Sequence, residues 1–146
     1  MTDALVAFLK ARLDDDERTA QAATPGPWCD SGGYVTDIDE DGHSRVQVTD
    51  FGTQDEDSEG SGPQGQADSA HIARHDPART LREVEAARAV IGLYEEAGNR
   101  MDRAMNDSDT VAYQEARVEQ RTLRKVLLHE AAVHEAHPDY LPEWQP

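Results

Sequence analysis

The side chains best suited to chemistry in this sequence are its paired histidines. His71 and His75 are four residues apart, so on a helix they would share one face. His134 and His137 are three residues apart near the end of the sequence, and His129 precedes them by about one helical turn. Imidazoles are common ligands of Zn²⁺ and Ni²⁺. One interpretation is therefore that the two pairs together form a metal site.

An oxygen ligand for such a site would come from a nearby acid: Asp76, Glu130 or Asp139. The spacing is permissible for a metal site without being distinctive, since zinc proteases place a glutamate directly after the first histidine and His71 is followed by Ile72. The other interpretation is structural, because histidines near a helix C-terminus cap carbonyls and interact favourably with the helix dipole. We therefore expect no bound cofactor and keep zinc as the alternative.

Three arginines surround the predicted start of a long helix at Asp76-Pro77: Arg74, Arg79 and Arg82. Positive charge at a helix N-terminus opposes the helix dipole, so a bound phosphate or carboxylate would explain this placement. The alternative is that these arginines pair with the protein's own acids, such as Glu83 or those of residues 52–66.

Few other side chains are candidates for a site. Cys29 could act as a nucleophile with a distant histidine, but a lone cysteine is more often a small buried residue. As the single cysteine, it excludes an internal disulfide and fits a reducing cytosol. Trp28, Tyr140 and Trp144 are expected to anchor the core or the tail, or to be hot spots at an interface. The sequence has no glycine-rich phosphate loop, nucleophile elbow or Cys-x-x-Cys pair, so no catalytic residue is assigned.

The net charge of the sequence limits the classes of partner that the protein could bind. Among 146 residues, 30 are acidic and 14 basic, which gives a formal net charge of -16, and residues 30–68 hold eleven acids and one base. This charge repels nucleic-acid phosphates, so direct nucleic-acid binding is not expected. It would instead speed the encounter with a basic protein partner, unless it serves solubility alone. No apolar run reaches the roughly 18 residues of a membrane span, and no signal peptide is present, so we expect a cytoplasmic protein without a membrane partner.

The elements that would position these residues are mostly helices. Residues 3–23 are predicted to form the first helix, with Thr2 as N-cap and with apolar residues at helical spacing: Leu5, Phe8, Leu9 and Leu13. A short helix is predicted over 67–75, and two long helices over 77–102 and 110–136. The short connection between the long helices predicts an antiparallel hairpin.

Two strands are predicted between the first helix and the short one. Residues 34–38 and 45–49 alternate in the manner of half-buried strands, and Asp41-Gly42 between them is typical of a hairpin turn. A third strand around Trp28 is left open. Residues 52–66 contain no apolar side chain and predict an acidic mobile loop.

Three segments together resemble a known family. They are LVAFLKARL at 5–13, the block HIARHDPAR at 71–79 continuing into LREVEA at 81–86, and the ending from His137-Pro138-Asp139-Tyr140 to Trp144. They resemble a family of uncharacterised small proteins of actinobacteria and their phages, a domain of unknown function. The break Pro25-Gly26-Pro27-Trp28, followed by two strands and a helix, is also similar to Ea22-like phage accessory proteins. Many relatives have a cysteine-rich insertion near the helix hairpin, which is missing here. The resemblance implies a common folding unit and no activity.

These observations predict a single α+β domain over residues 1–146, with an N-terminal helix, a β-hairpin and a long antiparallel helix hairpin. We expect a small, acidic, non-enzymatic interaction protein of phage or mobile-element origin. It would bind a protein partner or self-associate through the helix hairpin. The alternative is a histidine-based metal-binding protein or metal-dependent hydrolase that uses His71, His75, His134 and His137.

Overall fold

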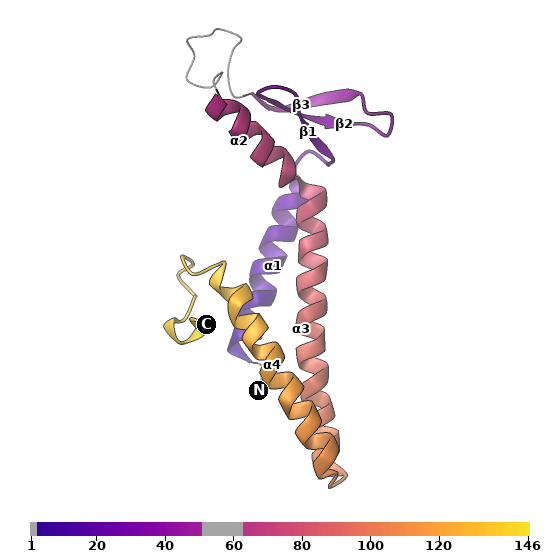
Figure 1. Cartoon of the computed structure of the whole chain (residues 1–146), viewed down its shortest axis with the longest axis vertical. Coiled ribbons are helices and arrows are strands. Elements are labelled where there is room, and N and C mark those ends of the chain that lie inside the picture. The colour runs from indigo at the N-terminus through magenta and orange to yellow at the C-terminus, as the bar shows by residue number, and fades with distance from the viewer. Residues whose placement is uncertain (1–2, 51–62) are drawn as a thin grey trace. The chain divides into compact units, whose positions relative to one another are not determined.

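The computed structural model describes residues 3–50 and 63–146 (Figure 1). Thr2 and most of the acidic segment 52–66 therefore lie outside the described residues. The chain divides into two compact units, one formed by residues 1–15 and 84–146 and the other by residues 16–83. Helices α1 (Ala4–Ala22) and α3 (Pro77–Asn106) contribute residues to both units. Each unit is described by itself.

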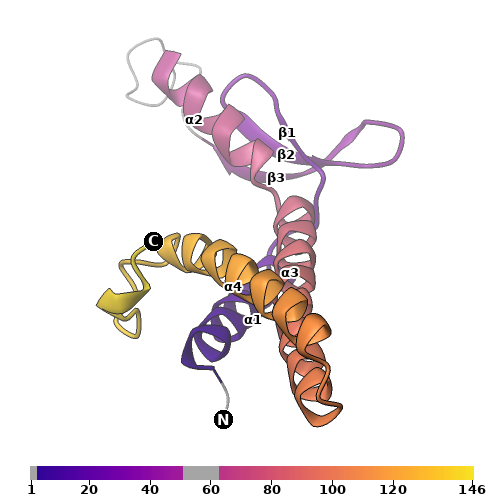
Figure 2. The same ribbon diagram turned by 60° about the horizontal axis from the view of Figure 1, so that its bottom comes forward.

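The first unit is helical. Its two longest segments belong to α3 and α4 (Thr110–Ala132), which pack together as an antiparallel hairpin, as the sequence predicts (Figures 1 and 2). The short connection ends at Asp109, which caps α4: its carboxylate accepts hydrogen bonds from the N–H groups of Val111 and Ala112. The last helix ends at Ala132, four residues before the predicted boundary, and the chain continues in turns.

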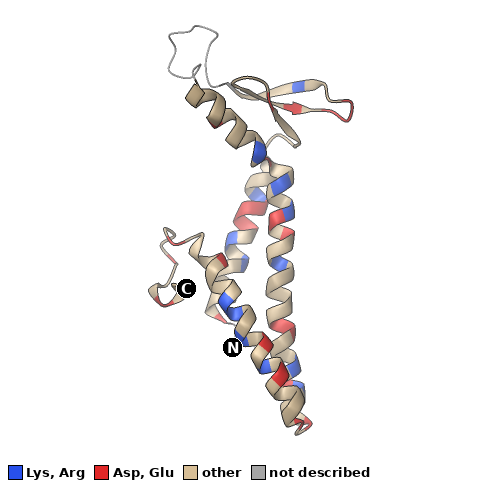
Figure 3. Cartoon of the chain, in the orientation of Figure 1, with Lys and Arg blue, Asp and Glu red and all other residues tan. Residues whose placement is uncertain are grey.

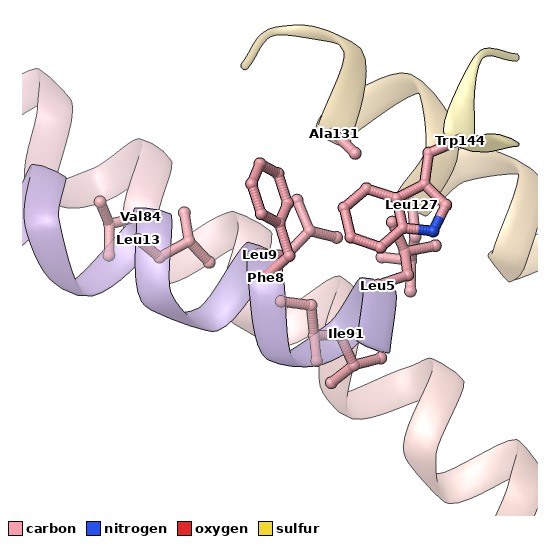
Figure 4. Close-up of a cluster of buried hydrophobic side chains, with 10 residues drawn as sticks. Leu5, Phe8, Leu9, Leu13, Val84, Ile91, Leu127, Ala131 and Trp144 are labelled. Carbon is pink, nitrogen blue, oxygen red and sulfur yellow. The ribbon is translucent and has the colours of Figure 1, made fainter. Parts of the chain in front are cut away.

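The core of this unit joins both ends of the sequence. Ten buried residues form it: Leu5, Val6, Phe8, Leu9, Leu13, Val84, Ile91, Leu127, Ala131 and Trp144 (Figure 4). The four apolar positions predicted for the first helix are all among them. Helix α3 contributes Val84 and Ile91 to this core, and its Ala87 and Tyr94 pack against the core, whereas Met105 at the far end is exposed.

The C-terminal tail docks on this core, as predicted. Trp144 is the last residue of the short 3-10 helix η1 (Pro142–Trp144), only 5% of it is exposed, and its ring centroid lies 5.0 Å from that of Phe8. Tyr140 contacts the same phenylalanine at 6.1 Å. A tail too short to form a stable element alone is thus held by aromatic packing.

The N-cap of α1 differs from the prediction. Asp3, and not Thr2, directly precedes the helix, and its Oδ1 accepts a hydrogen bond of 3.0 Å from the N–H of Leu5. Both residue types are good caps, so the one-residue error reflects the limits of boundary prediction.

The second unit contains a three-stranded antiparallel sheet in the order β1 (Trp28–Asp30), β2 (Tyr34–Ile38) and β3 (Ser44–Asp50). Strand β1 is the third strand that the sequence left open around Trp28. In the β2–β3 turn, Gly42 has φ +82°, a conformation that glycine adopts without strain. Helix α2 (Pro63–Arg74) lies against β1 and β2. It begins at Pro63, earlier than predicted, so residues 63–66 belong to a helix.

Polar contacts organise much of this unit. Buried Asp37 accepts hydrogen bonds from the N–H of Val46 at 2.6 Å and pairs with Arg45 at 2.9 Å. Fully buried Ser69 on α2 donates to Asp30 of β1 at 2.6 Å. Because these groups are paired, their burial does not leave an uncompensated charge or donor.

Among the described residues, no helix combines the length with the apolar character that crossing a bilayer requires.

Candidate functional site

The outward side of α4 presents a row of apolar side chains to solvent. Four valines form it, and we name them the α4 valine face: Val111 (67% exposed), Val118 (52%), Val126 (39%) and Val133 (78%). Their spacings are seven, eight and seven residues, which at 3.6 residues per turn keeps them on one side of the helix. Val133 directly follows α4 with helical backbone angles, φ -58° and ψ -27°, so it extends the same row.

These valines are exposed because another stripe of α4 supplies its contribution to the core. Ala116, Leu127 and Ala131 are buried on the opposite side of the helix. A surface helix normally has one apolar stripe and one polar side. Helix α4 has two apolar stripes, and only one of them is covered within the helical unit.

Three polar residues lie between the valines along the face: Glu115, Thr122 and His129. All three are exposed. The whole helix contains four basic and three acidic residues, so it is nearly neutral within a chain of formal charge -16. Acidic and basic residues are interspersed along α3 and α4 (Figure 3).

The predicted metal ligands His71 and His75 lie together at the C-terminal end of α2. Their ring centroids are 4.3 Å apart, and both side chains are exposed. The Nδ1 of His75 lies 2.8 Å from the carbonyl oxygen of His71, to which only an N–H can donate. Neutral His75 therefore has its Nε2 lone pair available, and a neutral imidazole can bind a metal through Nε2.

The other predicted ligands, His134 and His137, belong to the helical unit, whereas His71 and His75 belong to the other one. Both rings lie edge-on to Phe8, at centroid distances of 6.2 and 5.7 Å. The Nδ1 of His137 accepts a 3.1 Å hydrogen bond from the N–H of Asp139, which leaves the proton on Nε2. These two histidines thus contribute to aromatic packing and to the turn, while their part in a metal site stays a prediction.

Only one group of described residues brings three possible ligand atoms within 4.8 Å of one another: Asp39, Asp41 and His43, in the β2–β3 turn. The turn itself accounts for this cluster. The Oδ1 of Asp39 accepts hydrogen bonds from the N–H groups of Asp41, at 3.0 Å, and His43, at 2.8 Å. The carboxylate thereby stabilises the chain reversal, in the manner of an Asx turn.

The three arginines predicted to bind an anion are close in sequence to the start of α3. Arg79 donates through Nε to Glu83 at 2.6 Å and through Nη1 to the carbonyl of Arg74 at 3.2 Å. The buried carboxylate of Asp76 accepts a hydrogen bond from the N–H of Arg79 at 2.7 Å, so the protein's own acid caps this helix end. Arg74 and Arg82 are exposed, and anion binding by this group stays a prediction.

The aromatic residues predicted for an interface have contacts inside the chain. Trp144 and Tyr140 pack on the helical core, as described above. Trp28, in the other unit, is partly buried, and its Nε1 donates to the carbonyl of Thr24 at 2.9 Å. Cys29 beside it is partly buried, with its Sγ 3.5 Å from the carbonyl oxygen of Asp30.

A polar network connects the three helices of the helical unit. Tyr94 of α3 and Arg124 of α4 each donate to Oδ2 of Asp3, at 2.7 Å. Burial raises the pKa of Asp3, but the hydrogen bonds from Tyr94 and Leu5 and the charge of Arg124 outweigh it, so the pKa lies below its usual value. Burial and the hydrogen bond to Asp3 raise the pKa of Tyr94. Burial lowers the pKa of Arg124, yet its bonds to Tyr94 and Asp3 raise it overall. The role of this network is structural, because it connects the start of α1 to both α3 and α4.

The family of the chain follows from a comparison with family models. The model of DUF6221, described as a family of unknown function, matches residues 2–146. The chain belongs to DUF6221. This confirms the resemblance to a domain of unknown function over the whole sequence. Among curated proteins and among solved structures, nothing matches the DUF6221 chain.

Sequence reasoning about this DUF6221 chain missed the α4 valine face, although a signal was present. Val118 and Val126 lie on a different side of the helix from Leu127, because successive residues are about 100° apart. Plotting all apolar residues of 110–133 on one helical wheel would have separated two stripes. The network around Asp3 had no comparable signal, since its members are 91 and 30 residues apart.

Proposed function

We propose that this chain is a small acidic protein that acts by binding another protein through the α4 valine face, and not by catalysis. The supporting observation is the exposure of four aligned valines on a well-formed helix whose other side already supplies the core. Single exposed apolar residues are ordinary on protein surfaces, but four of them aligned on one side of a helix support an interaction site. An amphipathic helix or a helical partner would fit such a face.

Photo-crosslinking in cells that naturally produce the protein tests this proposal. A benzophenone amino acid at Val118, in the middle of the face, should form a protein adduct. The matched control is the same amino acid at the neighbouring Arg117, which is exposed on α4 but about 100° away around the helix. An adduct at Val118 with little at Arg117 supports the proposal. No adduct at Val118, or equal yields at both positions, would contradict it.

The acidic stretch at residues 30–68 is a separate part of the proposal. Its excess of ten negative charges would steer a basic protein toward the molecule by long-range attraction. Removing residues 53–62, which hold four of the acids, should then slow association and flatten its salt dependence. Unchanged rates at low salt would show that this stretch serves solubility alone.

Metal binding is a second candidate function, favoured by the tautomer of His75. Its Nε2 and the adjacent ring of His71 would present two imidazoles to a divalent ion such as Zn²⁺. Metal analysis and zinc titration of tag-free protein test it, with His71→Ala and His75→Ala as site variants and His129→Ala as control. Binding that the site variants abolish and the control retains would support the candidate, and no bound zinc would remove it.

An origin in actinobacteria, their phages or related mobile elements is also proposed. It is supported by the resemblance of the HIARHDPAR block at 71–79 and of the two chain ends to proteins of that source. Location of the gene within integrated phage sequences would support this origin, and a consistent location among housekeeping genes would not.

A further inference from the structure

The order of residues along the α4 valine face is symmetric. The four valines and the three polar residues between them come in the order Val111, Glu115, Val118, Thr122, Val126, His129 and Val133. They follow one another in steps of four, three, four, four, three and four residues, so the series reads the same in both directions around Thr122. Such a stripe, with an average period near 3.67, drifts by only about 40° around a helix over its length of about 33 Å.

The residues of this face are chemically complementary to those of a second copy of the helix that runs in the opposite direction. When a second α4 runs antiparallel with Thr122 opposite Thr122, Val111 meets Val133 and Val118 meets Val126. The acidic Glu115 then meets His129, whose ring N–H can donate to a carboxylate whether or not the ring is charged. Every apolar position is thus paired with an apolar one, and the single acid is paired with the single imidazole.

We propose that the partner of the α4 valine face is a second copy of this chain, bound antiparallel through α4 with a two-fold axis at Thr122. This inference rests on the proposed function, because it names the occupant of the same surface. A two-fold interface is isologous: residue i of one copy contacts residue j of the other, and j contacts i. The face meets this condition without any additional segment, and the near neutrality of α4 limits repulsion where two acidic chains would touch.

The mass of the purified full chain in solution is the first test. Sedimentation equilibrium should give twice 16.1 kDa at micromolar concentrations. Val118→Glu should weaken the dimer by about 100-fold or more, because two buried valines are lost per dimer. Leu93→Glu is the matched control, since Leu93 is similarly exposed (54%) but lies on α3. Its mass should stay that of the dimer. A monomer at all concentrations, or equal effects of both substitutions, would overturn the inference.

Disulfide trapping is the second test, because it shows which residues of the two α4 helices face each other. With Cys29→Ser as background, Thr122→Cys should form a disulfide-linked dimer, since only residue 122 meets its own copy. Cysteines at 115 or 129 would be about 21 Å from their copies, and at 118 or 126 about 12 Å, beyond the reach of a disulfide. Efficient crosslinking at 118 or 129 would indicate parallel pairing or another register and would overturn the inference.

The two proposals fail in different ways. A monomeric chain that still forms a Val118 photo-adduct of another mass would refute self-pairing and leave the proposed function intact. Loss of both the dimer and the adduct would refute both.

Discussion

Tyr94 and Tyr140 are phenols at the border of the same core, but their hydroxyl groups differ. The hydroxyl of Tyr94 donates to Asp3, whereas that of Tyr140 is buried without a hydrogen-bond partner in the described part of the chain. A satisfied hydrogen bond contributes about 1 kcal/mol, and a buried unsatisfied group contributes nothing or costs stability. Tyr94→Phe should therefore destabilise the protein by about 1 kcal/mol, and Tyr140→Phe should be neutral or stabilising. Urea unfolding of both variants measures this, and equal losses would contradict it.

Asp3 should make stability depend on pH. Because its pKa is lower in the folded protein than the roughly 3.9 of the unfolded chain, the carboxylate contributes stability above that value. This contribution is lost as the pH falls through the folded pKa. Asn caps helices as well as Asp, so Asp3→Asn removes the charge and keeps the cap.

The difference in unfolding free energy between the wild type and Asp3→Asn should be about 0.5–1 kcal/mol at pH 6, given partial solvent screening. It should shrink toward zero as the pH falls from the unfolded pKa of roughly 3.9 through the lower pKa of folded Asp3. The measurement is urea unfolding at several pH values. A difference that does not change with pH would show that the ion pair with Arg124 contributes nothing.

At the scale of the residue, the sequence predicted which side chains are buried better than it predicted which side chains contact one another. The apolar positions Leu5, Phe8, Leu9 and Leu13 were identifiable because burial on a helix repeats with its period. The bond of His75 to the His71 carbonyl and the salt bridge from Asp3 to Arg124 were not, since side-chain rotamers and contacts 121 residues apart leave no periodic signal.

Helix α4 lets two adjacent residues be compared at the scale of the element. Leu127 is buried in the core and Val126 belongs to the exposed face. Leu127→Ala should cost about 2–5 kcal/mol through lost burial and a cavity. Val126→Ala should change stability by less than about 0.5 kcal/mol, because it is exposed and alanine favours helices. Thermal and urea unfolding at submicromolar concentration, where association does not contribute, measure the difference. Similar losses would place Val126 in the core.

Element boundaries were predicted where local signals agreed. Residues 34–38 alternate and Asp41-Gly42 permits a positive φ, so β2 was predicted with its observed bounds. Helix α2 begins at Pro63 although Gly65 in its first turn is typical of loops. The opposing signals are the preference of Pro for the first helical position and the helix propensity of Gln64 and Gln66. Helix α4 ends before the predicted boundary: residues 133–136 form turns, although Glu135 and Ala136 are good helix formers.

At the scale of the whole molecule, the net charge and the α4 valine face have opposite effects on the association of two copies. Two chains of formal charge -16 repel, whereas apolar contact between their α4 helices attracts. Raising the salt concentration from about 20 mM to about 300 mM screens the repulsion and leaves the apolar contact. The dimer should therefore tighten several-fold with salt, as sedimentation at both concentrations would show. Weakening with salt would indicate that ionic attraction dominates.

The packing of Trp144 on Phe8 has a consequence for proteolysis. Trp144 covers the ring of Phe8, with the two ring centroids 5.0 Å apart, although the two residues lie far apart in the sequence. Cleavage of the chain between α4 and η1 would therefore release this cover and leave the aromatic ring of the first helix exposed. Exposed apolar surface of this kind favours aggregation, so a nicked protein should precipitate more readily than the intact one.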